Sequence, residues 1–336
     1  MRIVADVMGG DQAPVAVIKG SVMALERDAG LTMVLCGPKA VIERELGYLN
    51  APRDRIEIVD APDVIEMAEA PVTAIRQKKN SSLVVGMNLV AAGQGDGFIS
   101  AGSTGAVLAG ATFIIKRIKG INRPALAPIL PAKRGGRVLL IDCGANVDCK
   151  SEFLRQFALM GDAYMRTVTN APEPRVALIN NGAEPEKGNE LTKEAYKLLE
   201  KEPSIQFMGN LEPRYILSGA ADVVVCDGFV GNMLLKSLEG ASVFIFDSLK
   251  DIFMQSFATK IGAMILKPKL RSFKRTMDYT EYGGAPLLGV AKPVVKAHGS
   301  SNARAYSNAI AQLAQMIRGD VVGKIAQSLQ ASADQQ

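Results

Sequence analysis

The chain contains a single histidine, His298, in the segment KAHGSSN directly before a predicted helix. Imidazole is the one side chain whose unperturbed pKa lies near neutral pH. At a glycine-rich helix entrance it can donate a hydrogen bond to an oxyanion or to a departing sulfur atom. A structural capping histidine explains the same pattern, so His298 is a candidate catalytic residue with both interpretations open.

The segment SAGSTGA, residues 100–106, joins a predicted strand to a predicted helix. Its glycines allow a sharp turn. The hydroxyls of Ser103 and Thr104 and the N–H of Gly105 then stand at the positive end of the helix dipole, which favours phosphate or carboxylate. An ordinary Ser/Thr helix cap is the alternative. The segment has neither the lysine of a Walker loop nor the pattern G-x-G-x-x-G, so no nicotinamide cofactor is indicated.

Five predicted buried strands end in glycine together with Asp, Asn, Ser or Thr. Besides SAGSTGA, these ends read MGGD (8–11), DCGANVD (142–148), NGAEPEKGNE (181–190) and DGFVGN (227–232). Ligands bind at the edge of a parallel sheet where the carboxyl ends of its strands meet, so we expect one polar site there. The acids of DCGANVD lack a third ligand at metal-binding spacing, which favours a hydrogen-bonded scaffold over a metal site.

Short aliphatic runs alternate with helical segments along the whole chain. Runs such as RVLLID and DVVVCD are continuously apolar, as is typical of parallel strands that are buried on both faces. This alternation predicts an α/β fold, a three-layer α/β/α sandwich with a mostly parallel sheet. The predicted strands are Arg2–Val7, Leu31–Cys36, Arg55–Val59, Gly97–Ala101, Ala125–Leu130, Arg137–Asp142, Arg175–Asn180, Ile205–Met208 and Asp222–Cys226. The predicted helices are Pro14–Arg27, Lys39–Leu46, Ser81–Ala92, Gly105–Lys116, Ser151–Thr169, Glu190–Lys201, Gly231–Lys260 and Ala303–Arg318.

No Pro/Ser-rich linker divides the chain, so we expect one catalytic domain over residues 1–330 and a polar tail over 331–336. Within that domain, residues 244–270 combine apolar side chains at helical spacing with a basic end. A core or dimer helix is one interpretation. The other is a protruding tip around residues 244–275 that touches anionic lipid or an acidic protein. The tip residues that would make this contact are Phe257, Ile261, Lys267 and Lys269.

Composition excludes several classes of protein. Of 336 residues, 48% are hydrophobic and 22% charged, which excludes extensive disorder. The net charge of +5 comes without an Arg-rich arm, so nucleic acid is not an expected partner. Four cysteines without a C-x-x-C pair and one histidine indicate no zinc site. With no signal peptide and no apolar run of about 18 residues, we expect a cytoplasmic protein that does not span a membrane.

The ordered motifs of the chain resemble one known family over nearly its whole length. MGGD, SAG-x-TGA, NRPALAPILP, DCGANVD, LINNGAEPEKGNELTKEAY, DGFVGN, YGGAPLLG and KAHGSS follow one another as in the bacterial phosphate acyltransferases of phospholipid synthesis. The resemblance implies a fold similar to the isocitrate/isopropylmalate dehydrogenase and phosphotransacetylase group. It also implies transfer of a long-chain acyl group from acyl carrier protein to inorganic phosphate, with no cofactor. A homodimer is expected, peripheral on the inner face of the cell membrane, which passes acyl phosphate to a glycerol-3-phosphate acyltransferase.

For this reaction, we assign roles to the polar residues as a hypothesis. The catalytic candidates are His298, Asn232 and Asn146, with the two asparagines as donors to the substrate. The candidates for binding phosphate or substrate, or for orienting the loops that do so, are Gly9, Gly10, Asp11, Ser103, Thr104, Gly105, Asp142, Asn189 and Asp227. The candidates for contact with carrier protein or membrane are Lys187, Phe257, Ile261, Lys267 and Lys269.

Two positions depart from the family pattern. The family usually has Asn at the position of Ser103 and commonly has His at the position of Gln12. Two other functions stay open on the sequence alone. A phosphate acyltransferase that uses short-chain acyl-coenzyme A has similar chemistry, and a catalytically idle scaffold could recruit lipid-synthesis enzymes through the basic, apolar tip.

Overall fold

The computed structural model describes residues 1–169, 171–277 and 283–334 and divides the strands between two sheets. The first has seven strands, parallel except that β11 runs antiparallel to both of its neighbours. In sheet order these are β3 (Ile56–Asp60), β2 (Thr32–Gly37), β1 (Arg2–Asp6), β4 (Gly97–Ser100), β12 (Val294–Lys296), β11 (Ala285–Leu288) and β5 (Ala125–Leu126). Its helices are α1 (Val15–Arg27), α2 (Lys39–Gly47), α3 (Pro71–Gln77), α4 (Ser82–Ala91), α5 (Thr104–Gly110) and α10 (Ala303–Arg318).

Both faces of this first sheet are buried. Ile3 lies in the core cluster that includes α1 and α10, whereas Val4 lies in the cluster that includes α4 and α5. Successive strand residues point to opposite faces, so this division between two clusters is what a sheet between two helical layers produces. The layered, mostly parallel α/β architecture expected from the sequence is confirmed.

The second sheet has five strands, of which only β6 is antiparallel. In sheet order these are β6 (Ile129–Pro131), β7 (Arg137–Ile141), β10 (Val223–Val225), β8 (Arg175–Ile179) and β9 (Gln206–Leu211). The helices α6 (Ser151–Thr169), α7 (Glu190–Glu200) and α11 (Val321–Asp334) lie on one side of it. The first turns of α8 (Gly228–Met254) cover the other side through Val230, Leu234 and Leu238. One buried cluster runs from β1 through α10 and α6 to β7, so the two sheets share a core.

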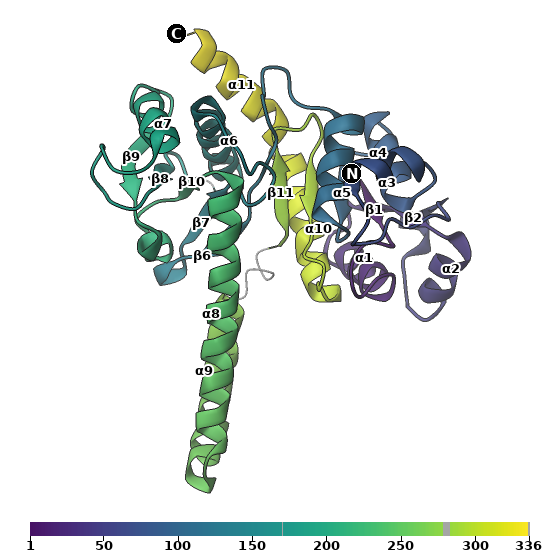
Figure 1. The fold of residues 1–336 in the computed structure, drawn as a ribbon. Coiled ribbons are helices and arrows are strands. Elements are labelled where there is room, and N and C mark those ends of the chain that lie inside the picture. Colours follow the sequence, from purple (N-terminus) through teal and green to yellow (C-terminus); the bar gives the residue numbers. More distant parts are fainter. Residues whose placement is uncertain (170, 278–282, 335–336) are drawn as a thin grey trace.

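The helices α8 and α9 (Phe257–Met277) form a long hairpin that projects away from both sheets (Figure 1). The range 244–275, for which the sequence predicts a tip, falls within these two helices. The predicted helix 231–260 is interrupted because Ser256 starts a new helix. The backbone N–H of Thr259 donates to Oγ of Ser256 at 3.2 Å, and the N–H of Ser256 donates to Oγ1 of Thr259 at 3.0 Å. Such reciprocal bonds satisfy orphan donors at a helix start.

Among the described residues, α8 is the one helix whose length and composition would allow it to cross a membrane. The sequence analysis found no continuous run of that length because Lys236 and Glu239 interrupt it. One such match is weak evidence for a span, because a helix of a folded domain passes the same test. Since the first turns of α8 pack on the five-stranded sheet, we describe it as one arm of the projecting hairpin.

Three expectations about individual elements differ from the structure. The predicted strand 125–130 is split at Ala127-Pro128, where the chain leaves the edge of one sheet and joins the edge of the other. The strands β11 and β12 escaped prediction because they are short and flanked by Gly and Pro; Tyr282, in the motif before β11, lies outside the described residues. The expected tail is helical as far as Asp334, because the buried hydroxyl of Ser332 donates to Glu202 at 2.6 Å and accepts from Arg155 at 2.6 Å.

Candidate functional site

The first part of the site surrounds Asp6, the buried last residue of β1. Its carboxylate accepts hydrogen bonds from Oγ of Ser82 at 2.6 Å and Oγ of Ser100 at 2.7 Å. Burial raises the pKa of Asp6, and these hydroxyl donors oppose the rise. The result is a rigid base from which the loops 8–11 and 100–105 leave the sheet. A Cβ on Gly9 would stand only 2.6 Å from the backbone nitrogen of Gly102, so the two loops touch backbone to backbone.

The loop that carries His298 joins these two loops. The backbone N–H of Asp11 donates to the carbonyl oxygen of Gly299 at 2.8 Å. Gly10 has a φ of 109° there, a left-handed conformation that suits glycine. Asp11 therefore holds the His298 loop through its backbone. The structure does not use Asp11 as a side-chain cap of α1, whose first turn has none.

The imidazole of His298 has a defined tautomer. The backbone N–H of Ser300 donates to Nδ1 at 3.2 Å, and Oγ of Ser300 lies 2.8 Å from the same nitrogen. A backbone N–H can only donate, so Nδ1 accepts and the ring proton stands on Nε2. Burial lowers the pKa of His298, which keeps the ring neutral at pH 7. His298 can thus serve as a neutral hydrogen-bond donor through Nε2.

A buried lysine, Lys296, stands behind this loop at the end of β12. Its Nζ donates to the carbonyl oxygens of Ala101, at 3.3 Å, and of Ala297. Burial lowers the pKa of Lys296 to about 8, although the charges of Asp11 and Asp6 oppose the change. Lys296 also lines a cavity of about 10 Å³ together with Thr104 and Ala145. That cavity joins the loops of the two sheets.

The loop after β7 is organised by Asp142, which is fully buried. Its carboxylate accepts hydrogen bonds from the N–H groups of Leu126 at 2.9 Å and Ala145 at 3.2 Å, and from both the N–H and Nδ2 of Asn146, at 2.7 and 3.0 Å. Burial raises the pKa of Asp142 to about 6 against the effect of these donors. Nδ2 of Asn146 also donates to the carbonyl oxygen of Pro124 at 2.8 Å. Both amide hydrogens are therefore engaged, and Asn146 supports the loop rather than offering a donor to substrate.

The start of α8 closes the site from the second sheet. Asp227 caps the helix by accepting from the N–H of Val230 at 2.8 Å, and the N–H of Gly228 donates to the carbonyl oxygen of Asn146 at 2.7 Å. Asn232, which is exposed, lies beside Gly144, since a Cβ on that glycine would be 3.7 Å from the Asn232 side chain. The loops 142–146 and 227–232 are therefore adjacent.

One face of α8 connects Asn232 with His298. Lys236 and Glu239 follow Asn232 at helical spacing and form an ion pair of 2.8 Å. Both charges act on the pKa of His298, Glu239 raising it and Lys236 lowering it, and Lys236 also acts on Lys296. The structure thus gathers Thr104, Asn146, Asn232 and His298 around one junction between the two sheets.

Two of the remaining predicted residues, Ser103 and Gly105, lie at the start of α5. Gly105 packs against α3, because a Cβ there would meet Cγ of Pro71 at 2.5 Å. Ser103 precedes the first residue of α5 and makes no side-chain cap with it, so its hydroxyl is not consumed by the helix. The tip residues Phe257 and Ile261 belong to the projecting hairpin and not to the junction, as do Lys267 and Lys269.

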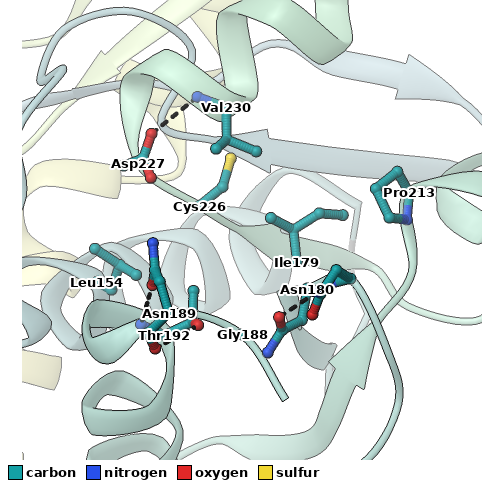
Figure 2. A pocket seen from close by; sticks show the side chains of 11 residues that line it. Leu154, Ile179, Asn180, Gly188, Asn189, Thr192, Pro213, Cys226, Asp227 and Val230 are labelled. Carbon is teal, nitrogen blue, oxygen red and sulfur yellow. Dashed lines mark hydrogen bonds between the residues drawn. The ribbon is translucent and has the colours of Figure 1, made fainter.

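Asn189 and Asp227 lie together in a separate pocket of about 380 Å³ in the second sheet (Figure 2). Lys187 belongs to the loop that borders it, and its carbonyl oxygen accepts from Nδ2 of Asn180 at 3.0 Å. Among the described residues, no group of three His, Cys, Asp or Glu side chains could hold a metal ion.

Sequence reasoning missed Lys296, Lys236 and Glu239. The motif KAHGSSN contains Lys296, but it drew attention only to its histidine. Lys296 follows the apolar residues Val294 and Val295 and precedes Ala297, and a lysine within such an apolar run indicates a buried ammonium. Lys236 and Glu239 could be found only by continuing the helical spacing from Asn232, since nothing local marks them.

Comparisons with known proteins identify the family of this chain. The model of the family described as "Fatty acid synthesis protein" matches residues 1–324. The chain is 50% identical to a phosphate acyltransferase of Clostridium acetobutylicum over 98% of this chain and 99% of the relative. It is 49% identical to a phosphate acyltransferase of Clostridium novyi over 97% of each chain.

Among solved structures, a phosphotransacetylase from Streptococcus pyogenes superposes with a TM-score of 0.63 at 20% identity, covering 95% of this chain and 94% of the other. A branched-chain phosphotransacylase from Enterococcus faecalis gives 0.58 at 16% identity, covering 94% and 99%. These two comparisons concern the fold alone. The family model and the sequence relatives show that the chain is an enzyme of the phosphate acyltransferase family.

Proposed function

We propose that the enzyme transfers a long-chain fatty acyl group from acyl carrier protein to inorganic phosphate and releases an acyl phosphate. An oxygen of the phosphate dianion attacks the thioester carbonyl carbon, the C–S bond breaks, and the phosphate proton passes to the departing thiolate. The products are acyl phosphate and the free carrier thiol. The acyl phosphate is a mixed anhydride suited to acylating glycerol 3-phosphate, the reaction of the downstream acyltransferase that we propose as a partner.

The chemistry demands little acid–base catalysis. A thiol has a pKa near 8.5 and leaves readily, and phosphate carries a nucleophilic oxygen at neutral pH because its second pKa is roughly 6–7. The enzyme must position the two reactants, an effect that can contribute about 7–11 kcal/mol. It must also stabilise the tetrahedral oxyanion, to which one donor contributes roughly 3–4 kcal/mol.

The single observation that carries this proposal is the meeting of three loops at one junction, where the buried ammonium of Lys296 donates to the carbonyl oxygen of Ala101 and the N–H of Asp11 donates to the carbonyl oxygen of Gly299 in the His298 loop. The ammonium of Lys296 and the hydroxyls of Ser103 and Thr104 supply charge and donors for phosphate. The neutral imidazole of His298 supplies an N–H for the oxyanion, and the side-chain amide of Asn232 supplies a second donor from the opposite loop.

The remaining assignments concern partners and location. We propose that acidic carrier protein meets the exposed Lys187 and the positive charge of the enzyme, which favours steered association. We further propose that the enzyme is cytoplasmic and rests on the inner face of the membrane through the hairpin tip, where Phe257 is 81% exposed and Ile265 73% exposed. A homodimer that covers part of the same apolar hairpin is a second proposal for this surface.

The test is incubation of the purified enzyme with acyl carrier protein thioester and phosphate, with mass detection of the mixed anhydride. We expect acyl phosphate and free carrier thiol in equal amounts, and no thiol when phosphate is omitted. Thiol release without phosphate would instead indicate a hydrolase. Preference for a short-chain acyl-coenzyme A as the donor would instead indicate a coenzyme-A-dependent phosphate acyltransferase.

A further inference from the structure

The 380 Å³ pocket of Figure 2 lies at the carboxyl ends of β8, β9 and β10, beside the reacting junction. Its size is within the range of small-molecule sites. Its apolar lining side chains are those of Leu154, Ile179, Val230 and Pro213. Its polar side chains are those of Asn180, Asn181, Asn189, Thr192 and Asp227.

Two polar groups of this pocket retain unused hydrogen-bonding capacity. Oδ1 of Asn189 accepts from the N–H of Thr192 at 2.9 Å, but its Nδ2 donates to no residue that the structure describes. Oδ1 of Asp227 accepts from the N–H of Val230, while its Oδ2 has no donor within the described chain. Asn189 and Asp227 therefore present one donor and one acceptor at the same side of the pocket (Figure 2).

The lining chemistry excludes several ligands. None of the lining side chains is cationic, and Asp227 is anionic, so inorganic phosphate would be repelled rather than held. A fatty acyl chain would offer no hydrogen bond to Nδ2 of Asn189, to Oδ2 of Asp227 or to the side-chain amide of Asn181, and would cover these polar groups without compensation. A neutral ligand that alternates amides with short apolar segments matches this mixture of polar and apolar lining residues.

The position of Asp227 connects this pocket to the chemistry. Asp227 lines the pocket, and the next residue, Gly228, donates to the carbonyl oxygen of Asn146 in the site loop. The pocket wall formed by Cys226 is also shared, because Sγ of Cys226 donates to the carbonyl oxygen of Asp142 at 3.4 Å. A flexible arm lying in the pocket would thus bring one end to the junction where the thioester must react.

We propose that this pocket binds the pantetheine arm of the thioester donor, an assignment that rests on the proposed function. Pantetheine carries two secondary amides, a hydroxyl and a gem-dimethyl group between short methylene runs. Its thiol end lies at the Asp227 side, next to Asn146 and Asn232. Its other end lies at the Asn180 side, beside the loop of Lys187, where the carrier protein or coenzyme A nucleotide would begin.

Variants can remove the ligand contacts and leave the fold intact. Asn189→Ser keeps the cap of α7, since serine is as good a helix cap as asparagine, but deletes the Nδ2 donor. Asn181→Ala removes an exposed amide for which the structure gives no side-chain hydrogen bond. Asn88→Ala, an exposed asparagine on α4 of the other sheet, is the matched control.

The experiment compares four dodecanoyl thioesters, made with carrier protein, coenzyme A, free pantetheine and N-acetylcysteamine. The last lacks most of the pantetheine arm but keeps the thioester. For the first three donors, Asn189→Ser and Asn181→Ala should each raise KM about 3- to 10-fold, as expected for a lost neutral hydrogen bond. The N-acetylcysteamine thioester keeps the amide next to the thiol, on the Asn189 side, but lacks the rest of the arm, so Asn181→Ala should change its kcat/KM by less than about twofold. Comparison of the carrier-protein thioester with the coenzyme A thioester shows which source of pantetheine the enzyme prefers.

For Asn181→Ala, equal losses with the pantetheine and N-acetylcysteamine thioesters would overturn the assignment of the pocket, as would no loss with any donor in either variant. Titration of free pantetheine into the enzyme by calorimetry separates this outcome from failure of the proposed function. If no donor yields acyl phosphate, the proposed reaction fails. Binding of pantetheine that weakens 3- to 10-fold in Asn189→Ser would then still support the pocket assignment, and unchanged or absent binding would refute it.

Discussion

Asp142 binds Asn146 through one carboxylate oxygen, which accepts from both the backbone N–H and the side-chain Nδ2 of that residue. This double contact fixes the loop after β7. The carbonyl oxygen of Asn146 also accepts a hydrogen bond from the N–H of Gly228 at the start of α8. The two loops that face the junction from the second sheet are thus held by one buried carboxylate, whose pKa burial raises to about 6.

The substitution Asn146→Asp should destabilise the enzyme strongly at pH 8. It removes a donor to Asp142 and places a second carboxylate beside it, at an expected cost of about 3 kcal/mol in free energy of unfolding. Two adjacent carboxylates bind a proton more tightly in the folded than in the unfolded chain, so the deficit should shrink as the pH falls from 8 to 5. Urea unfolding at both pH values measures this change.

Asn146→Ala is the control, because it loses the hydrogen bonds without adding a charge. Its deficit should be about 1–2 kcal/mol and should vary much less between pH 8 and 5. If the two variants had the same pH dependence, the Asp142 carboxylate would not be the group that Asn146 contacts in solution.

Gly9→Ala should separate the loops of the first sheet. The new Cβ would lie 2.6 Å from both the Gly102 nitrogen and Oδ2 of Asp6, so the backbone must shift. A displacement of about 1 Å in a positioned site costs roughly 100-fold in rate, and overpacking costs about 1–3 kcal/mol. Measurement of kcat/KM for phosphate and of Tm tests both effects. Gly47→Ala, where a Cβ would meet nothing within 4 Å, should retain wild-type values.

The sequence predicted which strands end at the site, but it did not predict how these strands pair into sheets. Continuous apolar runs and glycine-containing turns identify β1, β4, β7, β8 and β10, because buried parallel strands must have them. The division into two sheets was not predicted. It depends on the crossing at Pro128, where the chain changes sheets without any linker composition. The role of Gly105 likewise depends on a partner distant in sequence, Pro71 of α3, and Nδ2 of Asn146 also donates to the carbonyl oxygen of Pro124, which lies outside its turn. No local pattern reveals either contact.

The rate of the reaction should fall at alkaline pH because Lys296 loses its proton. Because burial lowers the pKa of Lys296 to about 8, the ammonium is lost as the pH rises through that value, and phosphate binding should weaken with it. A loss of activity above pH 8 would not result from unfolding caused by the deprotonation of Lys296. The unfolded chain binds this proton more tightly than the folded chain, so the Lys296 contribution to stability increases above pH 8.

Lys296→Met should lower kcat/KM for phosphate roughly 10- to 100-fold, as expected for a lost charge-assisted contact, and should abolish the limb near pH 8. Lys296→Arg should move that limb above pH 9, since guanidinium stays protonated. Steady-state rates from pH 6.5 to 9.5 test this, and an unchanged limb in Lys296→Met would assign the titration to another group.

His298→Ala should slow acyl phosphate formation roughly 100- to 1,000-fold in single-turnover experiments at saturating phosphate, the loss typical of one oxyanion donor. His298→Gln, which carries an amide N–H but no titratable ring, should recover part of the rate if Nε2 acts as a neutral donor. Equal rates for wild type and His298→Ala would remove the imidazole from the mechanism. Equal loss in both variants would indicate proton transfer rather than hydrogen bonding.

The hairpin tip should bind anionic vesicles through its apolar side chains. Phe257 and Ile261 are 81% and 46% exposed, and each contributes up to about 2–3 kcal/mol when it enters an apolar phase. The double variant with Phe257→Asp and Ile261→Asp should therefore reduce co-sedimentation with phosphatidylglycerol vesicles at least about tenfold. Tyr48→Asp, an equally exposed aromatic position at the end of α2, should pellet like wild type. If the double variant pelleted normally and sedimented as a monomer while wild type sedimented as a dimer, the tip would serve the second copy of the chain and not the membrane.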